Sequence, residues 1–191
     1  MKKDDIKLDE GYETFSEGPK FEFPREIFSL TKESEDLLKD NKDNKDKQME
    51  VFEHQLNIAE KLNLPVVIHS REAAGDTLEI LKKHHNFGVI HSFSGSLEMA
   101  KEYIKLGFVL GVNGVVTFKN CNLGDTLKNI DINSIILETD SPYLTPVPFR
   151  GTQNNPGKMI NTAKFVADIY GVSLSELAKI TNQNIKRIFI N

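Results

Sequence analysis

The sequence contains one short pattern twice, as VVIHS at residues 66–70 and as GVIHS at residues 88–92. Each copy is an apolar run without polar alternation that ends in a histidine, and His91 follows His69 by 22 residues. Such a run is typical of a parallel strand that is buried on both faces. The two copies therefore predict two strands of a parallel sheet, each with a histidine at its carboxyl end.

Helical periodicity fills the segments between the apolar runs. Residues 49–62 carry apolar side chains at steps of three and four, which predicts an amphipathic helix that faces the core. Further helices are expected at about 73–85 and 97–105, and residues 108–110 and 135–137 repeat the pattern of a buried strand. Four strands alternating with helices predict an α/β fold with a parallel sheet built from βαβ units.

The carboxyl-terminal part, from about residue 157, reads as two or three closing helices. Ser173 is a predicted N-cap, because Glu176 follows it at the capping-box spacing. Four strand residues are expected to be buried: Ile68, Ile90, Leu110 and Leu137.

Composition divides the chain near residue 47 and limits the classes of function. Residues 1–46 form a polar leader, predicted to be flexible or divergent, and residues 47–191 carry the strand and helix pattern. The chain has one cysteine, no apolar run long enough to cross a membrane and no signal peptide, so we expect a cytoplasmic protein without a membrane or stable protein partner. The net charge of −4 argues against a generally basic nucleic-acid surface, so an anionic substrate would need a local device such as a metal.

Polar residues follow the predicted strands at one edge of the sheet, where α/β proteins place their chemistry. His69, His91 and Asp140 are the predicted ligands of a divalent ion, Mg²⁺, Mn²⁺ or Zn²⁺, and Asp140 is also the candidate catalytic residue. Glu138 lies on the same side of its strand as Asp140. It either supports a ligand from behind or pairs with a basic residue in the interior.

Two arginines are candidates for binding a substrate phosphate, because a guanidinium group matches a phosphate with two hydrogen bonds. They are Arg71, just after the first histidine, and Arg150, in the loop after the last strand. For Arg71 a salt bridge with the neighbouring Glu72 is the alternative.

Four segments together resemble the TatD family of metal-dependent deoxyribonucleases. They are KQMEVFEHQLNIAEKLNLPVVIHSREA (47–73), IHSFSGSLEMAKEYIKLGF (90–108), GVVTFKN (114–120) and ILETDSPYLTPVPFRGTQNNP (136–156). The resemblance implies a TIM-like (β/α) barrel that hydrolyses DNA with a divalent metal. It places the family's metal-binding histidines at His69 and His91 and its carboxylate ligand at Asp140.

The chain departs from the family pattern upstream of residue 47. It has no His-x-His pair and no matching glutamate segment, both of which supply metal ligands in the family. We therefore expect an incomplete barrel of about four carboxyl-terminal βα units plus closing helices. In the last loop Phe149 stands where the family often has a histidine, which leaves Arg150 as the loop cation.

The expected function is hydrolysis of DNA phosphodiester bonds by a metal-activated water. Two alternatives remain open. One is a catalytically impaired fragment or pseudoenzyme that lacks the amino-terminal metal ligands. The other is a related metal-dependent hydrolase with a substrate other than nucleic acid, because the fold alone does not select the substrate.

Overall fold

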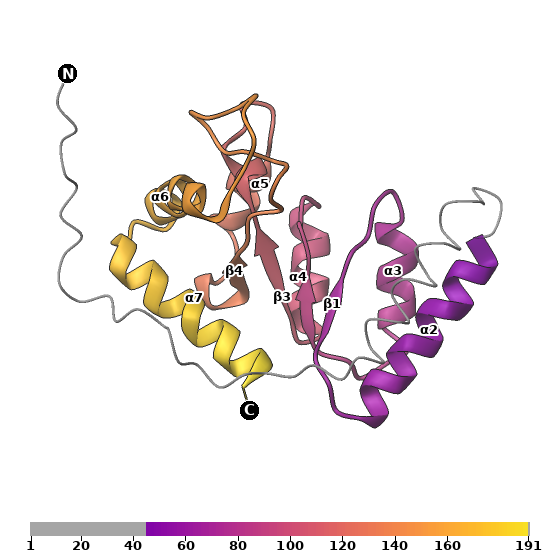
Figure 1. Cartoon of the computed structure of the whole chain (residues 1–191). Helices are drawn as coiled ribbons and strands as arrows, with labels where there is room; N and C mark the ends of the chain where they lie inside the picture. Colours follow the sequence, from indigo (N-terminus) through magenta and orange to yellow (C-terminus); the bar gives the residue numbers. More distant parts are fainter. Residues whose placement is uncertain (1–44, 191) are drawn as a thin grey trace, which may run out of the picture. The chain divides into compact units, whose positions relative to one another are not determined.

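The computed structural model describes residues 45–190, which form a parallel sheet flanked by helices (Figure 1). The strands are β1 (Val66–Ile68), β2 (Gly88–Ile90), β3 (Phe108–Val112) and β4 (Ile135–Leu137). They are ordered β1-β2-β3-β4 in the sheet, as along the chain, and all pairs are parallel. Neighbouring parallel strands need a crossover connection, and here helical segments supply it. The predicted α/β fold with four βα units is confirmed.

The helices agree with the sequence prediction except at their ends. They are α2 (Lys45–Lys61), α3 (Ala74–Leu81), α4 (Leu97–Lys105), α5 (Leu123–Leu127), α6 (Met159–Tyr170) and α7 (Leu174–Phe189), with 3₁₀ helices η1 (Gly114–Thr117), η2 (Ile132–Ser134) and η3 (Pro156–Lys158). Ser173 is the N-cap of α7, as predicted, and its hydroxyl accepts from the Glu176 N–H at 3.1 Å. Helix α3 is shorter than predicted, because the N–H groups of Lys83 and His84 bond three residues back and tighten the chain into a turn.

The face of the sheet that α2 to α6 cover holds most of the core. Ile68, Ile90 and Leu110 stand side by side in the register, and each is at most 4% exposed. They belong to one cluster with apolar side chains from the helices, including Leu56 of α2. Three of the four predicted buried residues are thus confirmed. Leu137 is only half-buried, because it ends β4 at the border of the described sheet.

The opposite face of the sheet is covered in part by α7. Val89, Val109 and Ile136 form a small cluster with Ile188 of α7. Val67, the partner of Val89 in the register, is 60% exposed. The prediction that the first strand is buried on both faces is therefore wrong, because α7 packs over β4 at the other end of the sheet.

Two local features are found near the start of β1. Gly88 has φ 149°, and a Cβ atom there would lie 1.9 Å from the carbonyl oxygen of Val66, so only glycine lets β2 approach β1 at this point. Leu62, predicted on the buried face of the first helix, is 62% exposed, because α2 ends one residue earlier, at Lys61.

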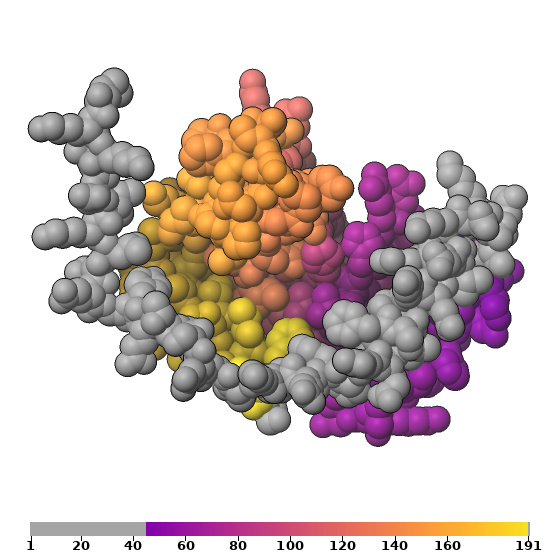
Figure 2. Space-filling view, viewed as in Figure 1, coloured from indigo at the N-terminus to yellow at the C-terminus, as the bar shows by residue number. Residues whose placement is uncertain are grey.

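The long segment between β4 and α6 projects beyond the carboxyl ends of the strands and forms a prominent part of the surface, coloured orange in Figure 2. It exposes the apolar side chains of Tyr143, Val147 and Phe149. None of the helices in residues 45–190 has the length and apolar character that crossing a bilayer requires. The predicted leader, residues 1–46, lies almost wholly outside the described residues.

Candidate functional site

The carboxyl ends of the strands bring the predicted polar residues to one edge of the sheet. His69 follows β1, His91 follows β2, and Glu138 and Asp140 follow β4. His91 lies between the two carboxylates: its Nδ1 is 2.8 Å from Glu138 Oε2, and its Nε2 is 3.0 Å from Asp140 Oδ1. Residues 47 positions apart in the sequence thus form one cluster.

Glu138 is held by two contacts with the loop after β2. Besides its bond to His91, its Oε1 accepts from the Ser92 N–H at 2.5 Å. The carboxylate fits there because Gly111 of β3 leaves room: a Cβ atom at position 111 would lie 2.6 Å from Glu138 Oε2. Within residues 45–190 Glu138 pairs with His91 and with no lysine or arginine, and its role behind a metal ligand stays a prediction.

A carboxylate faces each ring nitrogen of His91, Glu138 at Nδ1 and Asp140 at Nε2. A carboxylate only accepts, so Nδ1 carries the proton and donates to Glu138. Asp140 Oδ1 is also only an acceptor, so at 3.0 Å it takes a hydrogen bond from Nε2 when that nitrogen is protonated, and a divalent ion would take the place of that proton. Metal-binding histidines in proteins usually have this arrangement, with a carboxylate or carbonyl behind the ring that fixes the tautomer and orientation.

The backbone is sharply turned where the site residues follow their strands. Ser92 has φ 51° and Asp140 has φ 57°, both in the left-handed region that residues other than glycine rarely adopt. Such conformations persist where the surroundings hold them, and they are common at active sites. Here Asn113 donates to the Ser92 hydroxyl at 2.7 Å and accepts from the Val115 N–H at 3.1 Å, which ties the loop after β3 to the loop after β2.

His69 lies beside this cluster without joining its hydrogen bonds among the described residues. Its ring centroid is 5.5 Å from that of His91, and the planes are tilted by 39°. The residue is exposed at the end of β1, the first strand of the described sheet. Its neighbour Ser70 is bonded to Thr77 of α3 at 3.0 Å, which anchors the start of this loop.

The site fits a divalent ion through two of its atoms. Adjacent ligands of an octahedral ion at about 2.1 Å stand about 3.0 Å apart, and His91 Nε2 and Asp140 Oδ1 have this separation, 3.0 Å. Within residues 45–190 no group of three or more His, Cys, Asp and Glu side chains is arranged to hold a metal ion. The joint role of His69, His91 and Asp140 as ligands stays a prediction.

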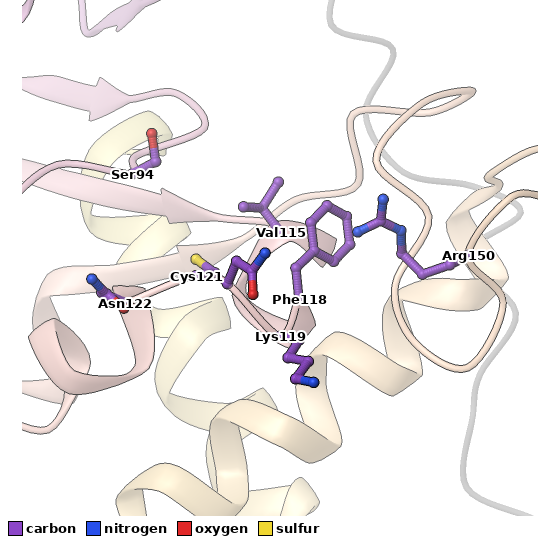
Figure 3. Close-up of a pocket in the computed structure, with 8 residues that line it drawn as sticks. Ser94, Val115, Phe118, Lys119, Cys121, Asn122 and Arg150 are labelled. Atoms are coloured by element: carbon purple, nitrogen blue, oxygen red, sulfur yellow. The ribbon is translucent and has the colours of Figure 1, made fainter.

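The two predicted phosphate-binding arginines lie in different surroundings. The Arg150 guanidinium carbon is 3.7 Å from the centroid of the Phe118 ring, so the loop after β4 contacts the loop after β3 (Figure 3). Arg71 is exposed in the loop after β1, and no ion pair joins it to Glu72 or to another residue in the described range.

Sequence reasoning missed three residues that shape the site. Gly111 provides the space for Glu138, Asn113 ties two loops together, and Phe118 positions Arg150. A signal was present for the first two, since the segment GVNG follows the third predicted strand at the same edge. Only the packing shows which side chains these residues meet.

The parallel sheet of four βα units, with polar residues at the carboxyl ends of its strands, places the chain in the class of α/β barrel folds. A family model described as TatD related DNase matches residues 35–190. The chain belongs to the TatD family, which confirms the resemblance seen in the sequence.

Individual relatives agree with this assignment. The chain is 40% identical over 153 residues to the uncharacterized metal-dependent hydrolase YabD of Bacillus subtilis, covering 78% of this chain and 60% of that protein. It is 40% identical over 147 residues to the uncharacterized metal-dependent hydrolase YcfH of Escherichia coli K12, covering 75% and 56%. The chain thus spans less than two thirds of the length of these relatives.

Solved structures show the same fold. The TatD homolog YJJV of Escherichia coli K12 superposes with a TM-score of 0.71 at 28% identity, over 76% of this chain and 57% of that one. A TatD family hydrolase of Entamoeba histolytica superposes with a TM-score of 0.67 at 22% identity, over 77% and 58%. The predicted incomplete TIM-like barrel is therefore confirmed.

Proposed function

We propose that this chain acts in the metal-dependent hydrolysis of DNA phosphodiester bonds, through the centre formed by His91, Glu138 and Asp140. The observation that carries the proposal is the position of His91 between two carboxylates, at 2.8 Å and 3.0 Å. One carboxylate orients the ring, and the other lies beside the ring nitrogen that would bind the ion. The relatives named as metal-dependent hydrolases support the same chemistry.

Each of the three residues of this centre has a separate role in this proposal, and so does Arg150. Glu138 holds the proton of His91 at Nδ1 and keeps the ring in place. His91 Nε2 and Asp140 Oδ1 would hold the divalent ion, which lowers the pKa of a bound water toward about 7 and stabilises charge on a phosphoryl oxygen. The second Asp140 oxygen can orient the attacking water and accept its proton. Arg150, exposed in the loop after β4, would bind a phosphate of the substrate.

The test is cleavage of single- and double-stranded DNA by the full chain with Mg²⁺ or Mn²⁺. The variant is His91→Ala, and the matched control is His54→Ala, because His54 is exposed on α2. We expect His91→Ala to lower the rate by at least about 100-fold and His54→Ala to leave it unchanged. Equal rates in the native chain and His91→Ala, or no cleavage by either, would overturn the proposal.

Metal binding gives a second measurement. Glu138→Gln keeps the shape of the side chain but removes the charge behind His91, so the affinity for Mn²⁺, measured by titration calorimetry, should fall by about 10- to 100-fold. An unchanged affinity would mean that Glu138 does not support the metal ligand. Mn²⁺ binding that depends on Glu138, together with cleavage of a substrate other than DNA, would support the metal centre and contradict DNA as the substrate.

A further inference from the structure

The loop that carries Asp140 is folded around one buried asparagine. Asn154 is 4% exposed, and its side-chain amide donates two hydrogen bonds of 2.7 Å, to the carbonyl oxygens of Thr139 and Tyr143. Its backbone N–H donates to the carbonyl oxygen of Pro142 at 2.9 Å. The chain on both sides of Asp140 is therefore bonded to a residue from the far end of the same loop.

The turn that follows Asp140 has little packing that could hold it in place. Residues 141–143 are exposed, and Tyr143 is 73% exposed, so their side chains bury little apolar area. The turn closes on itself through one backbone bond, from the Tyr143 N–H to the Asp140 carbonyl oxygen at 2.9 Å. Within residues 45–190, the hydrogen bonds that join this turn to the later part of the loop all come from Asn154.

The bond to Thr139 acts on the peptide group that precedes Asp140. That group is planar and contains both the Thr139 carbonyl and the Asp140 nitrogen, so holding the carbonyl fixes one side of the φ rotation at Asp140. This φ is 57°, in the left-handed region, which an aspartate keeps only where its surroundings hold it. In this conformation Asp140 Oδ1 lies 3.0 Å from His91 Nε2, and a relaxed backbone would turn the carboxylate away from the ring.

The chemistry of an asparagine side chain matches this position. Its amide nitrogen carries two donors for two carbonyl groups, and its oxygen is an acceptor, which here accepts from the Asn155 N–H at 2.9 Å. An ionised aspartate has nearly the same shape but only accepts, so it would face both carbonyl oxygens without a proton to donate. Because a buried carbonyl group without a donor is costly, the turn would then move toward water.

We propose that Asn154 is a positioning residue of the centre. Through two backbone carbonyl groups it holds Asp140 in the conformation that places the carboxylate beside His91. The inference rests on the proposed function for the role of Asp140 as a metal ligand. The hydrogen bonds of Asn154 form without a metal or a substrate, so its effect on Asp140 can be measured apart from DNA cleavage.

The test is the affinity of the full chain for Mn²⁺, measured by titration calorimetry, in the native chain and in Asn154→Asp. This variant keeps the shape of the side chain and adds a negative charge to the loop of a cation site, so charge alone would tighten binding. Loss of positioning has the opposite effect. We expect Kd to rise by about 10- to 100-fold, as is usual when a partner that orients a metal ligand is lost. Equal or tighter binding would overturn the inference.

A second buried asparagine provides a matched control at the other end of β4. Asn184 of α7 is 2% exposed, and its amide donates to the carbonyl oxygens of Ile132 and Ile135 at 3.3 Å and 2.8 Å. Asn184→Asp removes the same two donors and adds the same charge, but it leaves the turn after Asp140 untouched. It should change the Kd for Mn²⁺ by less than about 2-fold. An equal rise of Kd in both variants would indicate a general loss of structure and overturn the inference.

A double-mutant cycle shows whether Asn154 acts through Asp140. Asn154→Ala, which adds no charge, should raise the Kd for Mn²⁺ by about 10- to 100-fold in the native background. In an Asp140→Ala background the same change should raise Kd by less than about 2-fold, because the carboxylate that it positions is already absent. The same rise in both backgrounds would overturn the inference.

Amide hydrogen exchange in EDTA measures the turn without a metal. The Tyr143 N–H, which donates to the Asp140 carbonyl oxygen, should exchange at least about 10-fold faster in both Asn154 variants and at the native rate in Asn184→Asp. Unchanged exchange in the Asn154 variants would overturn the inference.

The outcomes separate this inference from the proposed function. Mn²⁺ affinity that depends on Asn154, in a chain that does not cleave DNA, would support the inference and overturn the proposed function. DNA cleavage that depends on His91 and not on Asn154 would do the reverse. If the native chain does not bind Mn²⁺, the proposed function fails, and the exchange of Tyr143 alone decides whether Asn154 holds the turn.

Discussion

Replacing Gly111 by alanine should displace the Glu138 carboxylate while both His91 and Glu138 keep their own side chains. The new Cβ would lie 2.6 Å from Oε2, 2.7 Å from Cδ and 2.8 Å from Oε1 of Glu138. Ordinary contact between such atoms begins at about 3.5 Å, so the carboxylate must move by about 0.8 Å. A shift of that size away from His91 Nδ1, now at 2.8 Å, breaks the hydrogen bond.

The expected cost follows from the two bonds that Glu138 makes. Hydrogen bonds to a charged group contribute about 1.5–3 kcal/mol each, and Glu138 accepts one from His91 and one from Ser92 N–H. Part of this free energy is recovered, because water can form hydrogen bonds with the displaced carboxylate. Alanine also lowers the entropy of the unfolded chain, which stabilises the fold by about 0.4–1 kcal/mol. Gly111→Ala should therefore lower the free energy of unfolding by about 2–4 kcal/mol.

Urea denaturation of two glycine variants provides the measurement. Gly75→Ala is the control, because nothing lies within 4 Å of a Cβ atom at this helical position, and it should be neutral or stabilising by up to about 1 kcal/mol. In a Glu138→Ala background, Gly111→Ala should cost much less, since the group it would strike is gone. A loss of stability below about 0.5 kcal/mol, or the same loss in both backgrounds, would show that the added Cβ does not act through Glu138.

Two further predictions concern stability. Val89→Ala should lower the free energy of unfolding by about 2 kcal/mol and Val67→Ala by less than about 0.5 kcal/mol, because Val89 is 1% exposed and its partner Val67 is 60% exposed. Similar losses for the two variants in urea titrations would contradict the one-sided burial of β1. Burial raises the pKa of Tyr170, and its hydroxyl, near Asp131, has no hydrogen-bond partner among the described residues. The unfolded chain releases the Tyr170 proton at a lower pH than the folded chain does, so the free energy of unfolding should fall as the pH rises above about 10. Tyr170→Phe should reduce this fall, which is measured by denaturation midpoints between pH 8 and 11.

Local sequence patterns predicted the elements well where each pattern is short and self-contained. The apolar runs before His69 and His91 are strands, and Ser173 caps its helix as its spacing with Glu176 indicates. Predictions failed where the outcome depends on distant parts of the chain. Val67 has the same β-branched character as Val89, but no helix within residues 45–190 covers it to the same extent, so Val67 is exposed and Val89 is buried.

Periodicity and motif order along the chain are enough to predict the alternation of strands and helices, the family, and the strand ends that carry His69, His91 and Asp140. The packing of the folded chain is needed to show that His91 lies between Glu138 and Asp140, that Gly111 makes room for this arrangement, and that Arg150 lies over Phe118. These contacts join residues on different strands and loops. Their distances depend on the register of the sheet and on the course of the loops, and no local pattern encodes either.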